Sequence, residues 1–60
     1  MSEMSPFELR TLAEAKFGKA RWLVKLAAET GVNVPTVERW ARGEWRITEK
    51  VATHVRAVCS

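Results

Sequence analysis

The sequence predicts an all-α protein of four short helices with a central helix-turn-helix. Two closely crossed helices need a small residue, then a glycine, then an aliphatic residue at fixed spacing. The chain has this pattern at Ala27, at Gly31 four residues later and at Val37 six residues after that. The alternating pattern of a strand occurs only from Val32 to Val37, and Pro35 interrupts it. Helices are expected at about 6–17, 19–30, 34–42 and 48–58.

The first helix carries a complete start signal. Ser5 is a favourable N-cap, Pro6 takes the first helical position, and Glu8 completes a capping box. Gly18 is expected to end this helix, because glycine adopts the left-handed conformation of a helix C-terminus at little cost.

Sixty residues make one domain at most. Residues 1–4 are expected to be a frayed N-terminal tail and residues 5–60 a single helix-turn-helix domain, with Met4 and Leu9 at the two positions of a hydrophobic staple. A domain this small buries only about 60% of the surface that its unfolded chain exposes. Dimerisation or ligand binding would therefore add stability.

The two central helices share the core. Leu23, Leu26 and Ala27 fall on one face of helix 19–30, while Trp22 either packs over the first helix or lies exposed beside DNA or a protein partner. The turn follows at Gly31.

The third helix, at 34–42, has Asn33 as its N-cap and Pro35 in its first turn. Val37 and Trp40 face inward, and Gly43 ends the helix.

The fourth helix has Thr48 as its cap and an apolar stripe formed by Ile47, Val51, Val55 and Val58. This stripe serves the core, a dimer, or both. We assign Val51, Val55 and Val58 to a candidate dimer interface, together with the C-terminal residues 57–60.

Composition narrows the possible functions. The net charge is +3 and the pI about 9.6, and the positive charge is concentrated in residues 15–46. A basic patch on one element is the electrostatic footprint expected of a nucleic-acid binder, and it fits an ordinary solvated surface equally well, since lysine and arginine are common on any helix. Cys59 is the only cysteine, so no internal disulfide can form, and a reducing cytoplasm is expected. No apolar run approaches the length of a membrane span, and the N-terminal residues, with Glu3 and no basic segment before an apolar run, are not expected to be a signal peptide.

A helix at 34–42 fits the major groove of double-stranded DNA, with its N-terminal residues nearest the base edges. Arg39 is the candidate guanine reader, and Thr36 is placed to contact a thymine methyl group. Glu38 either accepts from a cytosine amino group or orients Arg39, and Asn33 either reads a base or serves as the cap.

Phosphate contacts are expected from the flanking basic residues, which fix register but carry no sequence information. They are Lys19, Arg21, Lys25, Arg42 and Arg46. One unit makes few base contacts, so a homodimer on a pseudopalindromic operator is expected.

Several short motifs occur together between Phe17 and Ala57, about two-thirds of the chain. They are Phe17-Gly18, Leu26-Ala27, Gly31-Val32, Thr36-Val37-x-x-Trp40, Gly43 and Ile47. In these motifs the chain resembles small Cro-type phage repressors and their YdaS-like relatives. The resemblance implies a lambda-repressor-like fold, repression of a phage or mobile-element promoter, and DNA-facing roles for Thr36, Arg39 and Arg42. Some similar proteins autoregulate anti-CRISPR operons.

The chain departs from that family at two places. About one extra helical turn separates Gly18 from Leu26, and Trp22 stands where a polar N-cap is expected.

Other function classes fit the sequence less well. His54, the only histidine, has no arranged nucleophile, and with Cys59 it supplies too few ligands for a metal site, so no enzyme activity, cofactor or small-molecule ligand is expected. The alternative is a protein-binding inhibitor or antitoxin on the same scaffold, with Trp22 and Trp45 as interface anchors. Trp45 otherwise packs its loop onto the fourth helix.

Overall fold

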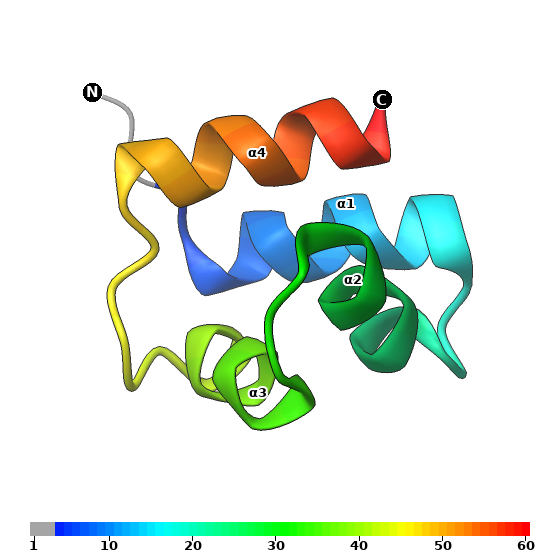
Figure 1. The fold of residues 1–60 in the computed structure, drawn as a ribbon, viewed down its shortest axis with the longest axis horizontal. Helices are drawn as coiled ribbons and strands as arrows, with labels where there is room; N and C mark the ends of the chain where they lie inside the picture. The colour runs from blue at the N-terminus through cyan, green and yellow to red at the C-terminus, as the bar shows by residue number, and fades with distance from the viewer. Residues whose placement is uncertain (1–3) are drawn as a thin grey trace.

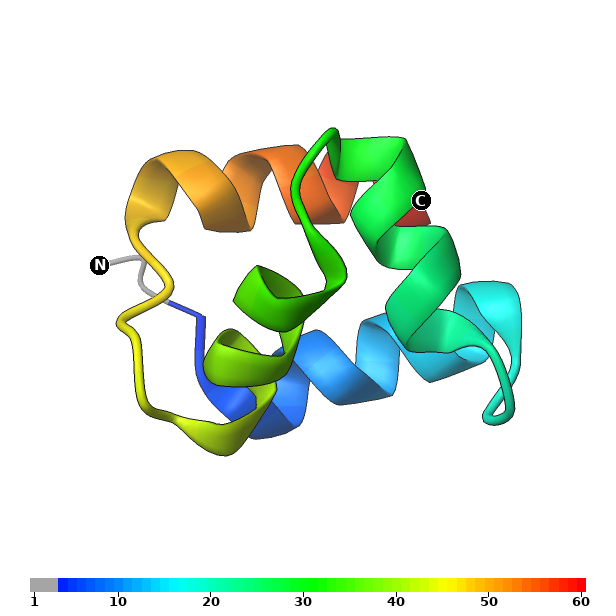
Figure 2. The ribbon, with the colours of Figure 1, turned by 60° about the horizontal axis from the view of Figure 1, so that its bottom comes forward.

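The computed structural model describes residues 4–60, which form four helices and no strand. The predicted all-α class with four short helices is confirmed. The first and last helices lie side by side and run in the same direction, and the two central helices pack against the first (Figures 1 and 2). The helices are α1 (Pro6–Phe17), α2 (Trp22–Thr30), α3 (Val34–Arg42) and α4 (Glu49–Cys59).

The caps at the N-termini of α1 and α4 are those that the sequence predicts. Ser5 has extended backbone angles, and its Oγ accepts a hydrogen bond of 3.1 Å from the Glu8 N–H. Thr48 does the same for α4, with its Oγ1 3.5 Å from the Val51 nitrogen. Each side chain satisfies an N–H group that the helix itself leaves without a partner.

The start of α2 differs from the prediction. Residues Lys19 to Arg21 form a turn, and the helix begins at Trp22 rather than at Lys19. Arg21, not Trp22, is the N-cap, and its side chain makes no capping hydrogen bond. Gly18 ends α1 with φ 94°, residues 19–21 form the turn that follows, and the new helix opens with Trp22, whose side chain is buried in the core.

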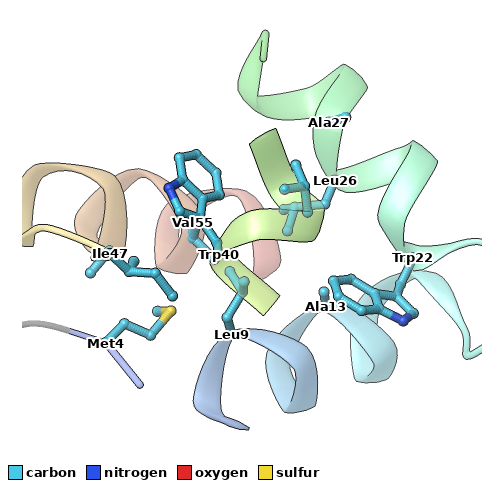
Figure 3. Close-up of a cluster of buried hydrophobic side chains, with 11 residues drawn as sticks. Met4, Leu9, Ala13, Trp22, Leu26, Ala27, Trp40, Ile47 and Val55 are labelled. Carbon is cyan, nitrogen blue, oxygen red and sulfur yellow. The ribbon is translucent and has the colours of Figure 1, made fainter. Parts of the chain in front are cut away.

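The core draws on all four helices and on residues outside them. Figure 3 shows Trp40 of α3 beside Val55 of α4, and Trp22 of α2 beside Ala13 of α1. Met4 lies next to Ile47 at the other end of this cluster.

Placing Met4 in a frayed tail was wrong. Its side chain is 3% exposed, because the chain entering α1 passes the loop before α4 and covers Ile47 there. The rest of the predicted tail, residues 1–3, lies outside the described residues.

The apolar stripe of α4 belongs mainly to the core of its own chain. Val55 is fully buried, and Val51 and Val58 are half-buried and pack against the core. Val55 as a dimer contact is therefore wrong, since α4 uses this face to cover α1 and α2. A buried side chain has no surface left for a second copy.

Candidate nucleic-acid interface

The connection between α2 and α3 is a tight turn. Gly31 has φ 76°, the left-handed conformation that the sequence predicts, and its N–H donates to the Ala27 carbonyl at 2.9 Å. Asn33 is the N-cap of α3, but its side chain makes no capping hydrogen bond and is exposed. The sequence left Asn33 two roles, as helix cap or as base reader. Its side chain does not cap the helix, so the amide group is available for another partner.

The face of α3 opposite the core is exposed and largely basic. Val37 and Trp40 anchor the helix, being 0% and 6% exposed, while Arg39 and Arg42 point away from the core. Thr36 is half-buried on the flank of the helix.

The two arginines have different surroundings. The Arg42 guanidinium lies between two carboxylates, 4.0 Å from Glu38 and 3.7 Å from Glu44. Glu38 thus pairs with Arg42, and within residues 4–60 it makes no ion pair with Arg39 that would orient that side chain. Because Arg42 is already balanced by two acids, a phosphate must compete with them for its donors.

Arg39 instead lies over an aromatic ring. Its Cζ atom is 4.9 Å from the centroid of the Trp45 ring, within the range of a cation–π contact. In the part of the chain that the structure describes, Arg39 forms no ion pair. Trp45 is 49% exposed, so its loop is not packed onto α4 in the way that would hide the ring. Sequence reasoning did not pair these two residues, although they flank the glycine that ends α3.

A groove of about 460 Å³ lies at the surface where α1 meets the N-terminus of α2 and the C-terminus of α3. It brings Lys19 and Arg42 together, as two of the predicted phosphate contacts, and it also holds the Arg10–Glu14 ion pair. The residues lining it are Arg10, Glu14, Lys19, Trp22, Leu23, Glu38, Ala41 and Arg42. Charges of both signs meet here.

The remaining predicted phosphate contacts are all exposed but come from separate places. Arg21 lies in the turn before α2, Lys25 lies on α2, and Arg46 lies in the loop between α3 and α4. None of the three lines the groove.

The two residues weighed for other chemistry occupy α4. His54 is exposed, as expected of a solvent-facing helix residue. Cys59 is a half-buried free thiol, and burial raises its pKa, with Lys16 acting in the opposite direction. Within residues 4–60 no group of three or more potential metal ligands gathers.

Comparisons with known proteins give no match: no family model, no curated protein and no solved structure resembles this chain closely enough to be assigned. None of the helices in residues 4–60 is long and apolar enough to cross a membrane.

Proposed function

We propose that this protein binds double-stranded DNA in a sequence-dependent way, with α3 in the major groove, and acts as a transcriptional repressor. The observation that carries this proposal is the state of Arg39. It lies on the exposed face of an anchored helix, and no described carboxylate pairs with its guanidinium. An arginine so placed can donate two parallel hydrogen bonds to O6 and N7 of a guanine.

The flanking charges support the same proposal. Lys19, Arg21 and Lys25 are exposed on the turn and helix that precede α3, where phosphate contacts would set the register of the helix in the groove. Asn33 and Thr36 at the start of α3 are the further candidates for base contact. Since one such unit reads few bases, we propose that two copies bind a pseudopalindromic site without using Val55 as a contact.

The test is a gel-shift assay with the DNA upstream of the gene for this protein, titrated with salt. Arg39→Ala should weaken specific binding by about 5- to 150-fold, the loss expected for one bidentate guanine contact, and leave the circular dichroism spectrum unchanged. Affinity of the wild type should fall steeply as salt rises, because each phosphate contact releases counterions.

Lys50→Ala is the matched control, since it removes the same charge from an exposed position on α4. It should change affinity far less than Arg39→Ala does. Equal losses of affinity in both variants would show that the protein binds DNA only through general charge attraction. Absence of any shift on this DNA and on nearby promoters would contradict the proposal.

A second candidate function has one observation in its favour. Trp45 is exposed and carries Arg39 on its ring, and exposed tryptophan with arginine is typical of protein-binding hot spots. An inhibitor or antitoxin acting on a protein target would lose more binding from Trp45→Ala than from Arg39→Ala. The DNA-binding proposal expects the reverse order.

A further inference from the structure

Trp45 differs from the other two tryptophans of the chain. Trp22 and Trp40 are 8% and 6% exposed and fill the core, whereas Trp45 keeps 49% of its surface in water. Its ring makes a cation–π contact with the Arg39 guanidinium. Trp45 is thus a large aromatic side chain at the surface beside Arg39, the candidate base-reading residue. Packing in the core does not explain this position.

The backbone fixes this contact. Gly43 ends α3 with φ 79°, and this turn sends the chain back along the helix it has just left. The N–H groups of Glu44 and Trp45 then both donate to the Arg39 carbonyl, at 2.9 Å and 3.3 Å. Trp45 is therefore tied by its main chain to the residue that its ring supports, in the manner of a Schellman cap extended by one residue.

Within residues 4–60 the Arg39 guanidinium donates no hydrogen bond, so its N–H donors are available beside the contact with the Trp45 ring. A guanidinium meets an aromatic ring through its flat face, while its N–H donors point outward in the plane of the group. The neighbouring Arg42 differs, because its guanidinium lies beside two carboxylates, 4.0 Å from Glu38 and 3.7 Å from Glu44, which partly balance its charge. Of the two exposed arginines on α3, Arg39 is the one whose guanidinium lies over an aromatic ring and not beside a carboxylate.

Holding the side chain matters because arginine is long and flexible. Fixing it on binding loses rotamer freedom worth about 2 kcal/mol. A ring that already restricts the guanidinium before binding reduces that loss, and it also limits the base positions that the group can reach.

We propose that Trp45 is a positioning residue that holds the Arg39 guanidinium for in-plane pairing with one guanine, so that Trp45 sets base preference through Arg39. This inference rests on the proposed DNA binding. It assigns to the loop after α3 a part in specificity without a base contact of its own.

The first measurement uses the protein without DNA. The aromatic ring should shift the NMR signals of the Arg39 side-chain protons upfield, and Trp45→Leu should abolish this shift while Trp45→Phe keeps most of it. Phe7→Leu is the control, since it removes an aromatic ring that is 79% exposed at the start of α1. Arg39 signals at ordinary positions in the wild type would overturn the inference, whatever the protein binds.

The second measurement uses a pool of DNA duplexes with a randomised core. Wild-type protein selects the preferred site, and Arg39→Ala identifies the guanine that Arg39 reads. Trp45→Leu should reduce preference for that guanine by about two- to fivefold, the amount expected of an exposed cation–π contact. Preferences at the other base pairs should stay as they are, Trp45→Phe should restore most of the loss, and Phe7→Leu should change nothing.

A double variant completes the test. Trp45→Leu added to Arg39→Ala should cause no further loss, because the residue through which Trp45 acts is gone. Unchanged guanine preference in Trp45→Leu, or an equal loss on every duplex, would overturn the positioning role while DNA binding stands. Failure of the wild type to select any sequence would overturn the proposed function itself, and the positioning role with it.

Discussion

At the scale of single residues, burial separates side chains that look alike in the sequence. Leu26 and Val24 lie on the same helix, yet Leu26 is fully buried and Val24 is 57% exposed. The helical period puts one toward α1 and α3 and the other toward water. Their contributions to stability should therefore differ sharply.

Leu26→Ala should lower the free energy of unfolding by about 2–5 kcal/mol, through lost apolar contact and the cavity left behind. A chain of this size has a total stability of only about 3–9 kcal/mol, so the variant should be close to unfolding at 25 °C. Urea denaturation followed by circular dichroism measures the change. Val24→Ala is the matched control, with an expected change within about 0.5 kcal/mol. Similar losses in both variants would contradict the packing described here.

At the scale of elements, glycines decide where helices end. Gly18, Gly31 and Gly43 are the residues with positive φ among those described, and each follows the last residue of a helix. A β-carbon at Gly31 would meet no atom within 4 Å, so only the backbone conformation resists substitution there. A substitution at Gly31 therefore tests the backbone conformation of the turn between α2 and α3 without a steric clash.

Gly31→Ala should destabilise the protein by about 1–2 kcal/mol, because an L side chain disfavours the left-handed region. Gly31→Asn should cost clearly less, since asparagine enters that region more readily. Thermal unfolding of both variants, followed by circular dichroism, gives the comparison. Equal melting temperatures for the two variants would show that backbone conformation is not what Gly31 supplies.

At the scale of the whole molecule, apolar burial and surface charge both connect α4 to α1. Val55 is fully buried in the shared core, while Arg56 forms a 3.0 Å ion pair with Glu8 of α1. Both partners of this pair are more than 40% exposed, so water and salt screen the attraction. The core should hold the two helices together with little help from the ion pair.

Arg56→Met should therefore cost less than about 1 kcal/mol relative to Lys50→Met, which removes a charge from the same helix at a residue that forms no ion pair within residues 4–60. The difference should disappear in about 1 M NaCl, where the Debye length is about 3 Å. Denaturation at low and high salt measures both variants. A larger difference that persists in high salt would assign the ion pair a structural role.

Local chemistry made much of the fold predictable from the sequence. Ser5 and Thr48 as caps, the three glycines as stops, and the inward side chains Val37 and Trp40 all depend on residues a few positions apart. Such features depend on short-range hydrogen bonds and helical periodicity. The predicted bounds 6–17 and 34–42 are therefore those of α1 and α3 in the structure.

What the sequence by itself determined about this protein is thus four helices, the glycines that end the first three of them, and the inward face of α3. The tertiary structure alone decided the burial of Met4 against Ile47, the late start of α2, the use of Val55 in the core and the contact between Arg39 and Trp45. Each of these depends on which segments meet after the chain has reversed direction. Periodicity assigns a residue to a face of its own helix, but only packing determines what covers that face.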